Sequence, residues 1–265
     1  MARKIVITSG KGGVGKTTIC ASLGMELARL GQKVLMIDAD VGLNNLDVIT
    51  NIESNIVYDM ADVLEGRCRI KQALLEVPNV ENLYILPSQH AYFSEDIGAK
   101  NFRLLINRLD SGFDFILIDC PAGIEKGFHR AVSASTEALV VTTPHISAIR
   151  DADKVIGLLA SYKINEVNII VNRVRGDMVL TGDMMDGMTI AKILKNMPIG
   201  IVPEDDNLGV YSQLGKLESN DSVSHLSFEF IADNILTGKR KLFDCTANYR
   251  GLFGKIKLKL KRGIL

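Results

Sequence analysis

Short runs of nearly continuous apolar residues recur along this chain, and longer segments with helical spacing lie between them. The runs are rich in valine and isoleucine and do not alternate with polar residues, as expected for strands buried on both faces of a parallel sheet. The pattern therefore predicts strands at residues 4–8, 33–38, 83–87, 113–119, 138–143, 167–172 and 199–202.

The segments between these strands have the length and periodicity of amphipathic helices. In the first of them, apolar residues recur every three or four positions and Gly31 follows as a terminator. The predicted helices are residues 16–30, 97–109, 126–136, 148–162 and 183–195. Alternation of this kind predicts an α/β fold: one doubly wound domain with a mostly parallel sheet. We place this P-loop domain at 1–237, a linker at 238–248 and a basic amphipathic tail at 249–265.

The composition of the 265 residues is that of an ordinary globular protein, with 47% hydrophobic and 23% charged residues. This excludes a disordered chain, a collagen-like chain and a disulfide scaffold. The four cysteines and four histidines show neither C-x-x-C pairs nor metal-ligand spacing, which favours reduced thiols. Neither a secretory segment nor a run of roughly 18 apolar residues occurs, so we expect a chain that is neither secreted nor transmembrane.

Charge is distributed unevenly although the 31 basic and 31 acidic residues balance. The final 17 residues carry six basic residues and no acidic one, so the body has a net charge of −6. On a helical wheel, apolar side chains of the tail fall within an arc of about 120°, with Leu258 on the opposite side. We predict an interfacial membrane helix that inserts Leu252, Phe253, Ile256 and Leu260 and presents Lys255, Lys257 and Lys259 to anionic lipid. The alternation within 255–261 also permits a strand, and a solvated or nucleic-acid-binding arm stays open.

A phosphate-binding motif directly follows the first predicted strand. Residues 10–17 fit G-x-x-x-x-G-K-[ST], with a buried strand before the motif and a helix after it. Glycines let backbone N–H groups approach a polyphosphate, and the first turn of the helix adds further donors. Lys16 is predicted to neutralise the β- and γ-phosphates of ATP, and the Thr17 hydroxyl to bind Mg²⁺. The predicted nucleotide-binding residues of the loop are Lys11, Gly12, Gly13, Val14, Gly15, Lys16, Thr17 and Thr18.

A second lysine, Lys11, distinguishes this loop from an ordinary P-loop. The run from Lys11 to Thr18 resembles the deviant Walker A motif of the MinD/ParA superfamily. The resemblance implies a catalytic lysine that reaches across an ATP-bound dimer to the phosphates of the partner subunit. A solvated loop lysine is the alternative.

The same resemblance assigns roles to acidic residues at the ends of two predicted strands. It implies that Asp40 orients the attacking water, and that Asp38 either contributes to the Mg²⁺ shell or holds a first switch loop ending at Asp47. Asp119 ends a Walker B strand, where a carboxylate binds Mg²⁺. Gly123 lies in a segment that resembles a second switch sensitive to the γ-phosphate.

Base recognition is predicted near the last two strands. Asn172 and Arg173 follow a buried run, and an asparagine amide can pair with the donor and acceptor edge of adenine. Pro203 and Glu204 close the next run and resemble the adenine-side loop of the superfamily. Because asparagine is also a common turn residue, the motif by itself is of moderate specificity.

Several further stretches resemble the bacterial septum-site-determining ATPases, the MinD family, over essentially the whole chain: residues 38–47, 119–125, 172–178 and 182–185. One position departs from the family pattern, because Gly176 stands where many relatives have proline. The resemblance implies a cytoplasmic ATP hydrolase on the inner face of the cell membrane that dimerises with ATP and Mg²⁺. Its implied partners are the division inhibitor MinC, the activator MinE or an analogue, and anionic phospholipid.

Three other functions remain possible on the sequence alone. A DNA-partitioning ATPase of the same fold would require a basic body surface, whereas this body is acidic, so DNA binding is not expected. A flagellar-number regulator with a similar tail is harder to exclude. An iron–sulfur ATPase would require paired cysteines, and Cys120 has no companion in the sequence.

Overall fold

The computed structural model describes residues 1–39, 45–88, 98–208, 222–251 and 254. They form an eight-stranded sheet in the order β3-β4-β2-β5-β1-β6-β7-β8, parallel except for β3 against β4. The predicted doubly wound α/β fold is confirmed. The strands are β1 Arg3–Thr8, β2 Val34–Asp38, β3 Leu75–Glu76, β4 Leu83–Leu86, β5 Phe115–Asp119, β6 Glu137–Thr142, β7 Glu166–Val174 and β8 Pro198–Pro203.

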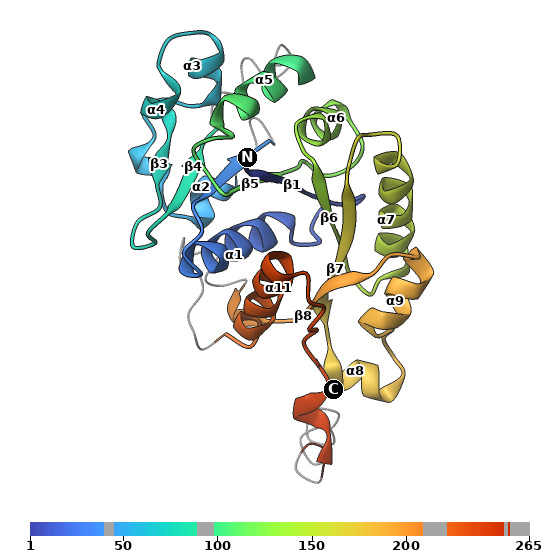
Figure 1. Cartoon of the computed structure of the whole chain (residues 1–265). Helices are drawn as coiled ribbons and strands as arrows, with labels where there is room; N and C mark the ends of the chain where they lie inside the picture. Colours follow the sequence, from blue (N-terminus) through green and yellow to red (C-terminus); the bar gives the residue numbers. More distant parts are fainter. Residues whose placement is uncertain (40–44, 89–97, 209–221, 252–253, 255–265) are drawn as a thin grey trace.

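Helices cover both faces of the sheet (Figure 1). One core lies beneath α1 and α11, centred on side chains such as Leu23 and Phe228, and the other lies beneath α5, α6, α7 and α9. Every residue of β2 and β5 is buried, which explains their uninterrupted apolar runs. The helices are α1 Lys16–Arg29, α2 Leu46–Ile49, α3 Met60–Leu64, α4 Ile70–Ala73, α5 Ala99–Leu109, α6 Lys126–Ser133, α7 Ile146–Leu159, α8 Gly176–Thr181, α9 Gly187–Leu194 and α11 His225–Thr237.

The predicted helix boundaries agree best with the structure where the sequence contains a strong helix terminator. Gly31 ends α1 with a φ of +82°, as predicted. The predicted helix at 183–195 is wrong at its start, because Asp186 accepts a hydrogen bond from the Thr189 amide at 2.9 Å and caps a helix that begins at Gly187. The prediction also missed the short α8, which ends where Gly182 adopts a φ of +81°.

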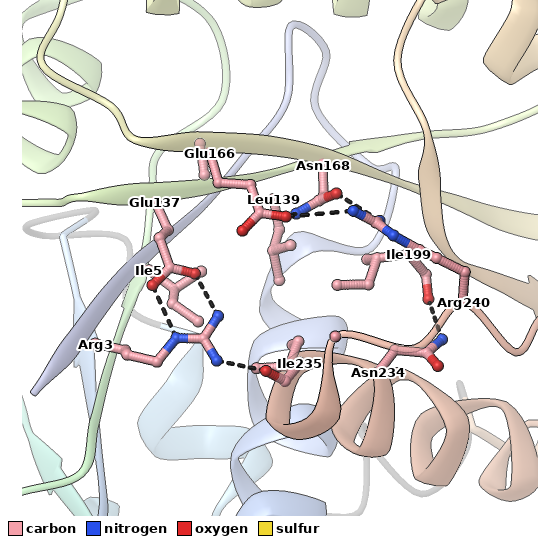
Figure 2. Close-up of a pocket in the computed structure, with 12 residues that line it drawn as sticks. Arg3, Ile5, Glu137, Leu139, Glu166, Asn168, Ile199, Asn234, Ile235 and Arg240 are labelled. Carbon is pink, nitrogen blue, oxygen red and sulfur yellow. Dashed lines mark hydrogen bonds and ion pairs between the residues drawn. The ribbon is translucent and has the colours of Figure 1, made fainter.

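The segment predicted as a linker packs on the domain (Figure 2). Arg240 donates to Asn168 at 2.6 Å and contacts Glu166 at 3.3 Å, both at the start of β7. Asn234 then fixes Lys241 through two hydrogen bonds, and Leu242 and Cys245 contact the core. We call residues 238–249 the strap. It ends in the short 3₁₀ helix η3, Ala247–Tyr249, which lies against α8.

Within the described residues, no helix is both long and apolar enough to cross a bilayer. All residues of the predicted tail that were assigned to the membrane, from Leu252 to Leu260, lie outside the described residues. The interfacial-helix prediction therefore stays a prediction.

Candidate nucleotide-binding site

The site lies at the carboxyl ends of the central strands, where doubly wound sheets bind their ligands. The loop after β1 enters α1 at this edge, and the register pairs Asp38 at the end of β2 with Asp119 at the end of β5. Sequence segments more than 100 residues apart are thereby brought to one side of the sheet.

Glycine is required by the backbone of the loop. Gly13 and Gly15 have φ values of +75° and +96°, in the left-handed region that favours glycine. A Cβ at Gly15 would also lie 2.5 Å from the side-chain nitrogen of Asn172. The loop therefore packs directly against β7 and leaves the first turn of α1 open as an anion site.

A cavity of about 290 Å³ lies over this turn. Its lysine, Lys16, has only 8% of its surface exposed, so its cation is directed into a confined site where it can pair strongly with phosphate. The predicted residues Gly12, Gly13, Gly15, Lys16, Thr17, Asp38, Asp119 and Arg173 line the cavity together with Asn45, Cys120 and Ala122. Val14 is buried beneath the loop.

The two strand-end carboxylates are buried within this cavity's wall. Asp38 accepts hydrogen bonds from the backbone amides of Asn45 at 3.2 Å and Leu46 at 3.4 Å, so it holds the start of α2. Thr17, Asp38 and Asp119 offer the hard oxygen donors that Mg²⁺ prefers. The described residues contain no group of three His, Cys, Asp or Glu side chains placed to hold a metal ion, but phosphate and water normally supply the remaining ligands of Mg²⁺.

A second cavity of about 250 Å³ adjoins the first, since Gly15 and Arg173 line both. It contains the predicted base-recognition residues together with neighbours that the sequence analysis did not single out. Its lining residues are Gly15, Thr18, Asn172, Arg173, Pro203, Glu204, Asp205, Asp206 and Leu208. The pair of cavities matches a ligand with a phosphate end and a base end.

An irregularity in β7 directs Asn172 and Arg173 into the site. Contrary to our prediction, the strand continues past Asn172 to Val174, and its register against β8 shifts between Val171 and Val174. Arg173 has a φ of +59°, so its side chain is exposed while Asn172 stays buried and donates to the Val14 carbonyl at 2.9 Å. Bulges of this kind commonly redirect side chains next to binding sites.

Asp205 fixes the loop of the base cavity. Its carboxylate accepts hydrogen bonds from the Ser222 hydroxyl at 2.5 Å and from both the amide and the hydroxyl of Ser224. Burial opposes ionisation, but these hydrogen bonds hold the pKa of Asp205 below its usual range. The serines lie 17 and 19 residues away, and no local sequence signal connects them to the loop.

Lys11 does not line either cavity; it is exposed beside α7. Its ammonium group donates to the Ser147 hydroxyl at 3.0 Å.

The predicted switch residues lie apart from one another. Gly123 has a φ of +87°, and its amide lies 3.3 Å from the carbonyl of Ser9, the residue directly before the P-loop, so the predicted second switch contacts the start of this loop. Asp47 is buried in α2, away from both cavity linings, and Asp40 lies outside the described residues.

Comparisons with known proteins identify the family. The AAA domain model AAA_31 matches residues 2–170. The septum site-determining protein MinD of Synechocystis sp. is 43% identical over 266 residues, which cover 99% of this chain and 100% of the relative. The chain belongs to the MinD family. MinD in the MinC:MinD complex of Aquifex aeolicus has a TM-score of 0.83 and 42% identity, over 90% of this chain and 97% of that one.

A second similar structure, also of a MinD, was solved with a bound nucleotide. MinD of Pyrococcus horikoshii, solved with Mg-ADP, has a TM-score of 0.79 and 29% identity, and the match covers 89% of this chain and 97% of that chain. Membership in the MinD family makes the chain a P-loop ATPase of the septum-site-determining type.

Replacing Asn172 with alanine should weaken ATP binding about tenfold and reduce the preference for ATP over GTP. The substitution removes the amide that faces the base cavity and also its hydrogen bond to the P-loop. Titration with fluorescent ATP and GTP analogues measures both effects. Asn168→Ala is the matched control, since Asn168 lies on the same strand, β7, but at the end that is far from the nucleotide site. Equal losses in the two variants would contradict a role for Asn172 in binding.

Proposed function

We propose that this MinD-family protein is an ATP-driven membrane switch that helps to place the division septum. It binds Mg-ATP, dimerises, associates through its tail with the inner face of the cell membrane and recruits MinC. MinE or an analogous protein stimulates hydrolysis and release. The MinC:MinD complex of the Aquifex relative supports the choice of MinC as partner, and the acidic body argues against DNA.

The position of Lys11 is the observation that supports the proposed ATP-dependent dimer. Lys11 is exposed and does not line the phosphate cavity as Lys16 does, so it is placed to approach the phosphates of a partner subunit rather than those of its own. Leaving its Ser147 contact requires little energy, because exposed polar pairs contribute at most about 1 kcal/mol. Closing of two subunits on ATP would bring one Lys11 toward each γ-phosphate.

Hydrolysis requires positioning and charge stabilisation rather than a covalent intermediate. A water oxygen attacks the γ-phosphorus, the bond to the bridging oxygen breaks, and ADP and inorganic phosphate form. Lys16 holds the β- and γ-phosphates, Lys11 offsets the charge that develops, and Asp40 orients the water. Thr17, Asp38 and Asp119 would hold Mg²⁺, which supplies positive charge to the phosphate oxygens when bound.

Helix α7 is the proposed docking face for MinC. Its outer surface presents Arg150, Asp153 and Lys154, and Ile146 at its start is 78% exposed. The helix touches the nucleotide site at two points, through Ser147 to Lys11 and through the Asp151 backbone, which a Cβ at Gly10 would overlap. A partner on α7 is therefore placed to sense the nucleotide state.

Co-sedimentation with anionic liposomes tests the switch. The full chain should pellet in ATP and remain largely soluble in ADP, because two tails on a dimer gain an avidity of about 10²–10⁴ over one. Phe253→Glu combined with Ile256→Glu should abolish pelleting, since both residues lie in the apolar arc. Leu258→Glu is the matched control on the opposite side of the wheel and should retain it. Nucleotide-independent pelleting together with ATP-dependent binding to duplex DNA would instead indicate a partitioning ATPase.

A further inference from the structure

A polar cavity of about 250 Å³ lies at the amino ends of β1, β6, β7 and β8, at the edge of the sheet opposite the nucleotide site (Figure 2). The strand register assembles it, because Glu137 at the start of β6 pairs with Ile5 of β1 on one side and with Glu166 at the start of β7 on the other. The end of α11 and the start of the strap complete its walls. None of the described residues that line it also lines either nucleotide cavity, so it is a separate cavity.

Arg3 enters this cavity as a rigid group. Its Nε and Nη2 atoms donate to the two carboxylate oxygens of Glu137 at 2.8 and 2.6 Å, and its Nη1 donates to the Ile235 carbonyl in the last turn of α11. The guanidinium also lies over the Phe115 ring, 5.4 Å from the ring centroid. A planar cation that is held in this way loses little freedom when it binds a ligand.

Arg240 reaches the same cavity from the strap. It donates through Nη1 to the Asn168 side chain at 2.6 Å and through Nη2 to Glu166 at 3.3 Å. Asn168 is buried, and its amide donates in turn to Glu166 at 2.8 Å. The Arg240 guanidinium is therefore oriented by β7, although the residue itself belongs to the strap.

The two arginines retain hydrogen-bond donors for a ligand. Each guanidinium has five N–H groups, of which Arg3 uses three and Arg240 uses two within the described part of the chain. Both carboxylate oxygens of Glu137 already accept a hydrogen bond. Both arginine side chains are slightly more than one-third exposed, at 37% and 36%, so a ligand can reach them from solvent. A surplus of fixed, charged donors favours a ligand that supplies oxygen acceptors.

The shape and charge of the cavity narrow the class of ligand. Figure 2 shows Arg3 and Arg240 on opposite sides of the cavity, with the apolar side chains of Leu139 and Ile199 between them. A carboxylate matches the planar fork of a guanidinium, and a short aliphatic chain suits the apolar part of the wall. The volume lies below the range of about 300–1,000 Å³ that is typical of sites for drug-sized ligands, so the ligand must be small.

The ion pairs of the cavity favour a single negative charge. Arg3 is paired with Glu137 and Arg240 with Glu166, so the charges of the cavity wall balance. A monoanion leaves one excess charge beside two guanidinium groups, whereas a dianion such as hydrogen phosphate brings a second charge close to both glutamates. These charges therefore favour a monocarboxylate over phosphate.

We propose that this cavity binds a small aliphatic monocarboxylate between Arg3 and Arg240. The bound ligand would connect β1 with the start of the strap and so stabilise the packing of the strap on the domain. The inference goes beyond the proposed function and does not depend on it, because the cavity shares no described lining residue with the nucleotide cavities.

NMR titration of the full chain with sodium butyrate tests the proposal, with sodium chloride at matched ionic strength as the reference. The side-chain Nε–H signal of Arg240 should shift saturably, with a dissociation constant of about 1 mM. Acetate should bind about tenfold more weakly, because it lacks two methylene groups. Arg240→Gln should weaken butyrate binding, followed by saturation transfer to its methyl group, by about tenfold or more. Arg103→Gln is the matched control, since Arg103 is exposed on α5 and does not line the cavity.

Several results would overturn the assignment. These are equal butyrate affinities in Arg240→Gln and Arg103→Gln, a shift that chloride reproduces, and a preference for phosphate over butyrate. Competition by ADP would also overturn it, because butyrate would then occupy the nucleotide site. Should Arg240→Gln fail to fold, Arg240→Lys keeps the cation but removes the planar fork and should lower the affinity about fivefold. An undiminished affinity in Arg240→Lys would contradict the proposed recognition by the guanidinium.

Discussion

Replacing Lys16 with alanine should weaken Mg-ATP binding by about a hundredfold or more. The lysine is nearly buried in the wall of the phosphate cavity, so its hydrogen bonds to phosphate form in a confined site with little competing water. Two charge-assisted hydrogen bonds of about 1.5–3 kcal/mol each account for a loss of this size. Isothermal titration calorimetry at several micromolar protein measures the change in dissociation constant.

Lys11→Ala is the informative control for this experiment. Lys11 lies five residues earlier in the same loop but does not line the cavity, and its ammonium group donates to the Ser147 hydroxyl. ATP affinity of the monomer should therefore change by less than about twofold, while ATP-dependent dimerisation, followed by light scattering, should be lost. The melting temperature of the nucleotide-free protein should stay near that of the original chain in both variants. Normal ATP binding by Lys16→Ala would show that the cavity does not hold the phosphates.

Sequence reasoning succeeded where the determinants are local. The P-loop is encoded within nine consecutive residues, and the strand-end positions of Asp38 and Asp119 follow from two uninterrupted apolar runs. In doubly wound folds, the carboxyl ends of the strands meet on one side of the sheet, so the sequence alone predicts that these residues lie close together.

The elements that were missed depend on contacts between distant residues or on caps. Helix α3 is only five residues long and is fixed by a capping box in which Asp59 and Asp62 bond each other's backbone amides. Asp205 depends on serines beyond a segment of more than a dozen residues. Arg130 has the pattern of an ordinary surface residue on a short helix, yet the structure buries it and its guanidinium donates to the Ala39 carbonyl at 3.0 Å.

The strap is another segment whose structure depends on contacts with distant residues. Its basic start at 238–241 is typical of a solvated linker, yet Arg240 reaches the start of β7 and Cys245 lies against Gly176 at the start of α8. The fit depends on Gly176, the position that departs from the family pattern. A Cβ there would overlap the carbonyl oxygen of Cys245, so the backbone of the strap approaches α8 as closely as only glycine permits.

Replacing Gly176 with alanine should therefore displace the strap and expose Cys245. The φ of Gly176 is not in the left-handed region, so alanine suits the backbone and the overlap alone opposes it. We expect a loss of about 1–3 kcal/mol in the free energy of unfolding, as for other overpacked sites. Burial raises the pKa of the Cys245 thiol to about 12 in the packed strap, and release should return that pKa toward the ordinary thiol range.

Thiol labelling reports this change directly, because the thiolate is the reactive form. At pH 8, the packed Cys245 is almost entirely protonated, and a fall in its pKa raises the thiolate fraction tenfold per unit, so labelling should accelerate by about a hundredfold or more. A Cys68→Ser background removes the other partly exposed cysteine, since Cys20 and Cys120 are buried. Gly157→Ala in α7 is the matched control, because a Cβ there meets nothing within 4 Å. Equal labelling rates in the two alanine variants would mean that the strap stays packed on the domain, and that the glycine at position 176 does not determine where the strap lies.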